Sequence, residues 1–142
     1  MTISSTTRAA ILDLVFLATT WANYAINATS SPQTSIAVGL HEADPGIGGT
    51  MATSEATYGS YARQDKLRTA AGWTRTSNSI SPAASILFPV GTGAGGTLTH
   101  FSTGKTGGGA APILWYGSLT PNIPSGSGIQ PELLAASTIS LT

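Results

Sequence analysis

The chain contains no cysteine among its 142 residues. This absence excludes disulfide bonds, thiolate zinc sites and cysteine nucleophiles. Disulfide-free proteins work on both sides of a membrane, so cysteine usage leaves the compartment open. We therefore expect the stability of the fold to come from packing and from subunit contacts.

Charge is also scarce. Only 8% of the residues are charged, against roughly 25% in ordinary soluble domains. Six basic residues balance six acidic ones, so the chain lacks the electrostatic footprint of a protein that binds nucleic acid or an anionic membrane. Near-zero net charge favours association, which predicts that further copies or another protein cover much of the surface. The alternative is a monomer coated with serine and threonine.

One helical pattern is present, from Thr6 to Asn27. Apolar residues recur there at spacings of three and four, namely Ile11, Leu14, Val15, Ala18, Trp21, Ala22 and Ala25. A signal peptide is the competing interpretation, since Arg8 precedes an apolar stretch, but Asp13 interrupts that stretch. The run is too short and too polar to span a bilayer. The pattern predicts an N-terminal helix.

The remainder of the chain predicts short strands separated by loops rich in glycine and proline. Expected strands are Thr34 to His41, Ser60 to Leu67, the segment with Trp73 and Arg75, Ile80, Ala84 to Phe88, the segment with Leu98 and His100, Ile113 to Leu119, and part of Ile129 to Leu141. This pattern favours a mainly β fold, an antiparallel β-sandwich or barrel with one N-terminal α-helix. We expect residues 1–30 to form a helix or arm and residues 31–142 to form the β domain.

Two motifs suggest a cofactor or a metal, and both lack the required context. Gly104-Lys105-Thr106 does not follow the glycine that a phosphate-binding loop needs five residues earlier, because Thr99 stands there. His41-Glu42 lacks the second histidine of the helical zinc motif, because Pro45 occupies its place. The other histidine, His100, lies on a different predicted strand. We predict neither a cofactor nor a metal site.

Hydrolytic chemistry is no better supported. The chain has no Gly-x-Ser-x-Gly nucleophile elbow. Paired carboxylates could serve glycoside cleavage, but the available ones have no special setting and are interpreted as solvated loop side chains. They are Glu42, Asp44, Glu55, Asp65 and Glu132. The sequence predicts a protein that is not an enzyme.

The one local excess of positive charge comprises Arg63, Lys66, Arg68 and Arg75. With neighbouring aromatic rings it could bind nucleic acid, but Asp65 dilutes it and the sequence pI is about 6.7. Arginine and aromatic residues are enriched at protein interfaces, which we favour here. The candidate interface residues are Trp21, Tyr61, Arg63, Trp73, Trp115 and Tyr116.

Four short signatures follow one another in a fixed order: His41-Glu42-Ala43-Asp44-Pro45-Gly46, Tyr61-Ala62-Arg63-Gln64, Gly96-Thr97-Leu98-Thr99-His100-Phe101 and Leu114-Trp115-Tyr116-Gly117-Ser118-Leu119. Their order resembles a family of short virion proteins of tailed bacteriophages, often labelled tail fibre proteins. The resemblance covers roughly Ser35 to Thr142. It implies a small structural virion protein with no enzymatic residues to carry over. The helix and the loop from Gly104 to Gly109 depart from the family pattern.

Within that resemblance we favour a capsid cement or decoration subunit on the capsid surface, with the major capsid protein as partner. No repetitive shaft sequence is visible, and such a shaft is usual in a fibre. The alternative is a tail fibre or tail-associated module that binds a receptor or glycan. We expect a homo-oligomer, a trimer if it sits at capsid symmetry axes. Because the resemblance begins after the helix, we expect the helix to face a partner.

Overall fold

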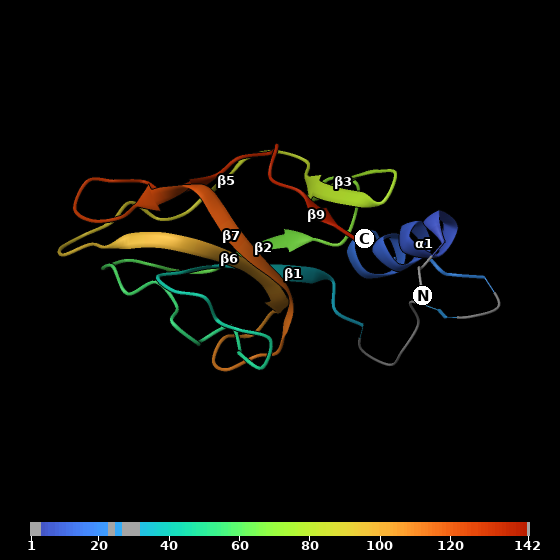
Figure 1. Cartoon of the computed structure of the whole chain (residues 1–142), viewed down its shortest axis with the longest axis horizontal. Coiled ribbons are helices and arrows are strands. Elements are labelled where there is room, and N and C mark those ends of the chain that lie inside the picture. Colours follow the sequence, from blue (N-terminus) through green and yellow to red (C-terminus); the bar gives the residue numbers. More distant parts are fainter. Residues whose placement is uncertain (1–3, 23–24, 27–31, 142) are drawn as a thin grey trace. The chain divides into compact units, whose positions relative to one another are not determined.

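The computed structural model describes residues 4–22, 25–26 and 32–141. Their elements are α1 (Ser5–Phe16), β1 (Ser35–His41), β2 (Gln64–Leu67), β3 (Trp73–Thr76), β4 (Ser79–Pro82), β5 (Ile86–Leu87), β6 (Thr97–Lys105), β7 (Ile113–Pro124), β8 (Glu132–Leu133) and β9 (Ile139–Ser140) (Figure 1). Within this described part, the strands form three sheets, none of them a closed barrel, and the pairs whose register is resolved are antiparallel. The expected mainly β class with one N-terminal helix is confirmed.

The chain divides into two compact units, each discontinuous in sequence. Unit 1 comprises Met1–Ser35, Lys66–Ser85 and Leu134–Thr142, and unit 2 comprises Ile36–Asp65 and Ile86–Leu133. The boundary expected between residues 30 and 31 falls outside the described residues and stays a prediction.

Helix α1 belongs to unit 1 and begins directly after a serine cap. The Ser4 side chain accepts a hydrogen bond from the backbone N–H of Thr7, as an N-cap hydroxyl does. Its buried residues are Leu12 and Phe16, which have no exposed surface. The helix contacts β3 and β4 of the same unit, and Figure 1 shows it beside β3 and β9. The helix therefore packs within unit 1 through Leu12 and Phe16, while Ile11, Leu14 and Val15 of the predicted apolar face are only partly buried, and a partner for that face stays a prediction.

The helix ends at Phe16, well before the predicted end at Asn27, which lies outside the described residues. Leu17 is the C-cap, and Ala18 takes the left-handed conformation with φ of 53°. The backbone N–H groups of Leu17 and Thr19 both donate to the carbonyl of Asp13, which closes the last turn. A left-handed residue at this point commonly terminates a helix. The predicted helix is therefore wrong over the described residues 17–22 and 25–26.

Arg68 satisfies carbonyl groups that the end of α1 leaves without intrahelical partners. Its guanidinium donates to the carbonyl oxygens of Leu14 and Val15, at 2.6 and 2.5 Å, and to that of Gln33 at 2.6 Å. A cation near a helix C-terminus also interacts favourably with the helix dipole. Burial lowers the pKa of Arg68. Arg68 therefore serves the fold of unit 1 rather than an external anion.

The sheet of unit 1 has the order β3-β4-β9 and packs against α1 through Trp73. Trp73 is 2% exposed, and its ring meets that of Phe16 edge to face, with centroids 4.7 Å apart. Arg75 on the same strand forms an ion pair with Asp13 of the helix. The expected strand around Trp73 is confirmed, but its aromatic side chain is a core residue.

The four-stranded sheet has the order β2-β1-β6-β7, and unit 2 contains its β1, β6 and β7 pairing. Strand β1 pairs with β6, with Ile36 opposite Lys105 at one end and His41 opposite His100 at the other. Five of the seven residues of β1 are hydrophobic or glycine, and all five are buried. Strand β7 continues past the predicted end at Leu119 to Pro124 and contains a cis bond before Pro121. Unit 2 also holds the short β5–β8 ladder.

Two glycines in this sheet make room for Met51, which has no exposed surface. A Cβ at Gly39 would lie 3.1 Å from the Met51 methyl group. A Cβ at Gly104 would lie 2.5 Å from the Met51 sulfur and 2.7 Å from the carbonyl oxygen of Pro112. The segment from 42 to 63 can thus lie close against the sheet because two strand residues lack side chains. Gly104 belongs to β6, although the sequence suggested that it begins the following loop.

Gly104→Ala is expected to lower the free energy of unfolding by about 1–3 kcal/mol, because an added methyl group overpacks this site. Urea denaturation followed by circular dichroism measures the change. Gly48→Ala is the matched control: a Cβ there meets nothing within 4 Å, and its φ is not positive. Equal stability of the two variants would contradict the close packing of Met51 against β6.

Candidate functional site

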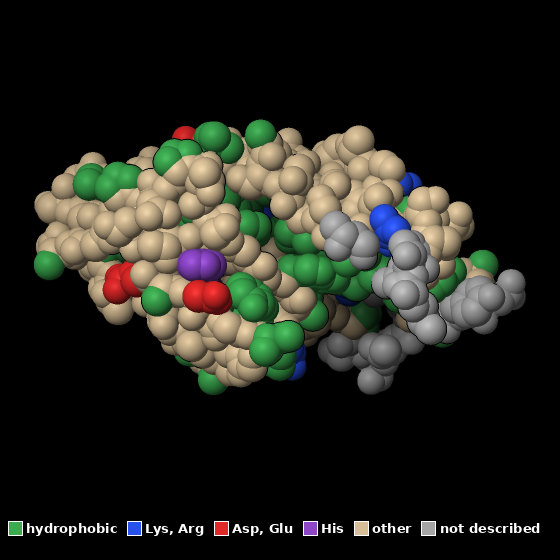
Figure 2. Space-filling model, viewed as in Figure 1, with side chains coloured by type: hydrophobic (Ala, Val, Ile, Leu, Met, Phe, Trp, Pro, Cys, Tyr) green, Lys and Arg blue, Asp and Glu red, His purple; other side chains and the backbone are tan. Residues whose placement is uncertain are grey.

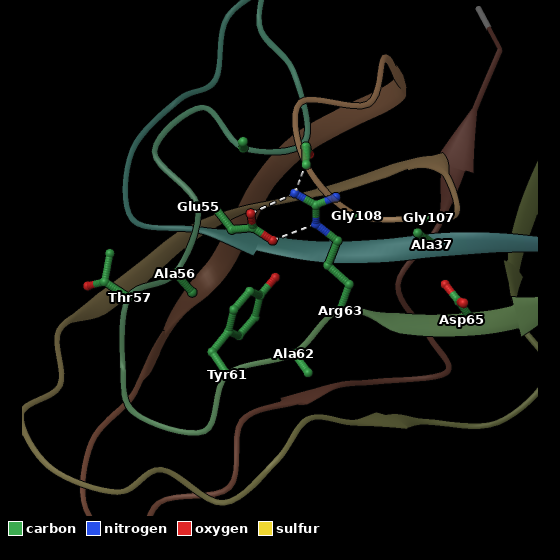
Figure 3. A pocket seen from close by; sticks show the side chains of 12 residues that line it. Ala37, Glu55, Ala56, Thr57, Tyr61, Ala62, Arg63, Asp65, Gly107 and Gly108 are labelled. Carbon is green, nitrogen blue, oxygen red and sulfur yellow. Dashed lines mark hydrogen bonds and ion pairs between the residues drawn. The ribbon is translucent and has the colours of Figure 1, made fainter.

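An open pocket of about 730 Å³ lies on unit 2 (Figure 3). It is lined by small residues, by four ionisable side chains, and by a glycine loop. The lining comprises Ala37, Ala52, Glu55, Ala56, Thr57, Tyr61, Ala62, Arg63, Asp65, Gly107, Gly108 and Gly109. The pocket is the candidate site because it brings together polar groups from three separate stretches of unit 2.

Arg63 and Glu55 form a two-pronged ion pair in the pocket wall. Arginine Nε donates to Oε1 and Nη2 to Oε2, both at 2.6 Å, and the side chains are only 12% and 21% exposed. Nη2 also donates to the carbonyl oxygen of Gly109 at 2.9 Å. The hydrogen bond with Glu55 raises the pKa of Arg63. Glu55 is therefore not the solvated loop carboxylate expected from the sequence, and the pair fixes one end of the glycine loop.

Tyr61 is held by contacts on several sides. Its hydroxyl oxygen accepts a hydrogen bond from the backbone N–H of Leu40 at 2.9 Å. Its ring stacks on Phe88 with centroids 6.2 Å apart and meets Tyr58 edge to face at 5.4 Å. Burial raises the pKa of its hydroxyl. Tyr61 thus supports the pocket wall, and the aromatic cluster makes that wall rigid.

The open side of the pocket is formed by Asp65 and the glycine loop. Asp65 is exposed, and within the described part of the chain its carboxylate makes no hydrogen bond. Figure 3 shows it apart from the ion pair, beside Ala37. Gly107, Gly108 and Gly109 have φ values of 107°, 75° and 64°, which side chains rarely adopt, so their backbone is left bare.

Sequence reasoning named Tyr61 and Arg63 as interface candidates but missed the partners that form this pocket. Glu55 stands eight residues before Arg63 in a loop, a spacing with no regular meaning outside a helix or strand. The run Gly107-Gly108-Gly109 has no side chains whose pattern could indicate its contact with Arg63.

The other candidate interface residues are distributed over both units. Trp21 and Trp73 belong to unit 1, where Trp73 is buried, and their part in an interface stays a prediction. Trp115 and Tyr116 lie on β7 of unit 2, where Trp115 is partly buried and Tyr116 is 38% exposed. The face in Figure 2 shows few charged side chains among uncharged and hydrophobic ones.

His41 is fully buried in unit 2 at the end of β1. Its Nδ1 lies 2.8 Å from the carbonyl oxygen of Thr53, which can only accept, so Nδ1 donates. Nε2 lies 2.7 Å from the hydroxyl of Ser102 and accepts from it when the ring is neutral. These partners lie 12 and 61 residues after His41 in the sequence, so loop and strand contacts hold the ring. Burial is the main cause that lowers the pKa of His41 below 6.5.

The buried His41 predicts that the protein loses stability in mild acid. The pKa of His41 is lower in the folded than in the unfolded state. The contribution of His41 to folding stability is therefore fully present above about pH 6.5 and is lost as the pH falls through the pKa of the folded state. Urea midpoints from pH 7.5 downward measure this slope, which His41→Gln is expected to flatten. The control is His100→Gln, which removes the other histidine. A slope that disappears only in the control would contradict the assignment.

Among the described residues, no cluster of three or more histidine, aspartate and glutamate side chains is arranged to hold a metal ion. No described helix is long and apolar enough to cross a membrane. The ionisable side chains of the pocket and of the helix end are largely occupied with ion pairs and carbonyl groups of this chain.

The fold and the site together define a mainly β protein whose polar side chains in the pocket wall mainly hold the fold. A family model described as podophage GP4 fiber I protein gp80 matches residues 2–141, and the chain belongs to this family of phage fibre proteins. The search of curated proteins finds no match. The resemblance expected from the sequence is thereby confirmed. Its expected start at Ser35 is wrong, since the match includes helix α1.

Proposed function

We propose that the chain is a non-enzymatic building block of a phage tail fibre and that it takes part in contact with the host surface. The family match over nearly the whole chain carries this proposal. The same match favours the tail over the capsid-cement role that the sequence suggested. Hydrogen bonds within this chain hold the side chains of His41, Glu55 and Arg68, which agrees with a structural role.

Immunogold labelling of intact virions tests the location. Antibody against the recombinant chain is expected to decorate tail appendages. Label confined to the head would overturn the proposal and support a capsid partner instead. Labelling of particles after mechanical removal of their tails, carried out in parallel, distinguishes label bound to the tails from background.

We further propose that the chain works as a homo-oligomer with other virion proteins as neighbours. The neutral charge supports this, as do exposed hydrophobic side chains such as Leu87, Leu114 and Leu134. Light scattering coupled to size exclusion measures the assembly, with an oligomer expected. A uniform monomer at micromolar concentration would count against self-assembly of the isolated chain.

A further inference from the structure

We propose that the pocket around Asp65 and Gly107–Gly109 binds a neutral sugar unit. This inference rests on the proposed function, since a fibre that meets a host surface encounters its glycans, and it names the ligand class and the site. The argument comes from the size, the charge and the bare backbone of the pocket.

The size of the pocket suits one or two sugar rings. Ligand pockets generally occupy about 300–1,000 Å³, and this one measures about 730 Å³. Its lining includes Ala37 and Ala62, whose short side chains leave the space open. In the glycine loop, an added Cβ at any of the three positions would meet nothing within 4 Å. A ring can therefore enter without displacing a side chain.

The charge of the pocket selects a neutral ligand. Arg63 and Glu55 neutralise one another through their two-pronged contact, which leaves the carboxylate of Asp65 as the uncompensated charge. A carboxylate repels phosphate and acidic sugars but accepts strong hydrogen bonds from neutral hydroxyl groups. Because Asp65 makes no hydrogen bond within the described chain, its acceptor capacity is available to a ligand.

The glycine loop and Arg63 offer further polar groups. Bare backbone N–H and C=O groups at Gly107–Gly109 can exchange hydrogen bonds with sugar hydroxyls. Arg63 Nη1 is buried and has no partner among the described residues. In Figure 3 the guanidinium lies beside the Gly107–Gly108 segment. A buried donor without a partner indicates that an acceptor is missing beside the pocket wall.

Nuclear magnetic resonance of the full ¹⁵N-labelled chain tests the site directly. The probes are the methyl glycosides of glucose, galactose, mannose and N-acetylglucosamine, each raised to about 50 mM, because single-sugar affinities lie near the millimolar range. At least one probe is expected to shift the amide signals of Gly107, Gly108 and Gly109. Gly46, Gly48 and Gly93 lie outside the pocket and serve as internal references.

Asp65→Asn is expected to weaken that binding about tenfold, because it removes a charged acceptor. Glu132→Gln is the matched control, since it neutralises an exposed carboxylate of unit 2 on β8, outside the pocket. Ala62→Trp places a large side chain in the pocket lining. It is expected to abolish binding while the amide signals of the reference glycines stay unchanged.

Two results would overturn the sugar site. One is the absence of any shift at the loop glycines with all four glycosides. The other is a stronger response to inorganic phosphate or sialic acid than to the neutral probes, which would assign an anion to the pocket. Immunogold labelling tests the location in the tail independently of these results. The fibre role can therefore be tested even if the pocket binds no sugar.

Discussion

Trp73→Ala is expected to lower the free energy of unfolding of unit 1 by about 3–5 kcal/mol, the largest effect of any single change considered. Trp73 is 2% exposed and meets Phe16 edge to face, so the substitution empties the contact between β3 and α1. Partial collapse cannot fill the volume of an indole ring. Urea unfolding followed by far-ultraviolet circular dichroism measures the loss without depending on the removed fluorophore.

Trp73→Phe is the informative control for this prediction. The indole Nε1 of Trp73 is buried with no hydrogen-bond partner in the described residues. Phenylalanine keeps an aromatic ring against Phe16 and removes the unsatisfied donor, so it should cost much less than alanine. Equal losses for the two variants would show that ring packing against the helix contributes little.

Arg63→Met is expected to cost about 3 kcal/mol, because it leaves the Glu55 carboxylate in a mostly buried position without its partner. The residual exposure of both side chains keeps the expected loss at the lower end of the range for buried pairs. The variant also frees the carbonyl of Gly109, which is expected to loosen the loop. Chemical denaturation gives the stability, and hydrogen exchange at the loop glycines reports the loosening.

A double-mutant cycle isolates the pair. Glu55→Gln removes the charge of the partner, and the combined Arg63→Met and Glu55→Gln variant should lose less than the sum of the single losses. Arg63→Lys keeps the charge but not the fork geometry, so it should recover only part of the stability. Strict additivity in the cycle would mean that the ion pair contributes no coupling.

The strands of unit 2 were predictable because their signals are local. Ile36, Val38 and Leu40 alternate with small residues, and β1 begins within one residue of its predicted start. The predicted strand from Ser60 begins only at Gln64. Ser60 has a φ of 73°, and the N–H of Tyr61 bonds back to the carbonyl of Tyr58, which makes a turn where the sequence suggested extended chain.

The end of the helix and the pocket could not be predicted from local patterns. The apolar spacing continues past Phe16 through alanines that fit several conformations, and the stop uses Ala18 in a conformation usually taken by glycine. The buried face also differs from the predicted one, since Leu12 and Phe16 are the buried residues. The Arg63–Glu55 pair and the glycine wall depend on loop paths, which have no period to detect.

The discontinuity of unit 1 sets an order for folding during synthesis. Helix α1 is made first, but its partners β3 and β4 follow only after residue 72, and β9 pairs with β4 near the C-terminal end of this sequence. At a synthesis rate of about 5–20 residues per second, the apolar side chains of Leu12 and Phe16 remain without these packing partners for several seconds. The nascent helix is therefore the segment on which a chaperone, or a neighbouring nascent fibre chain, would act first.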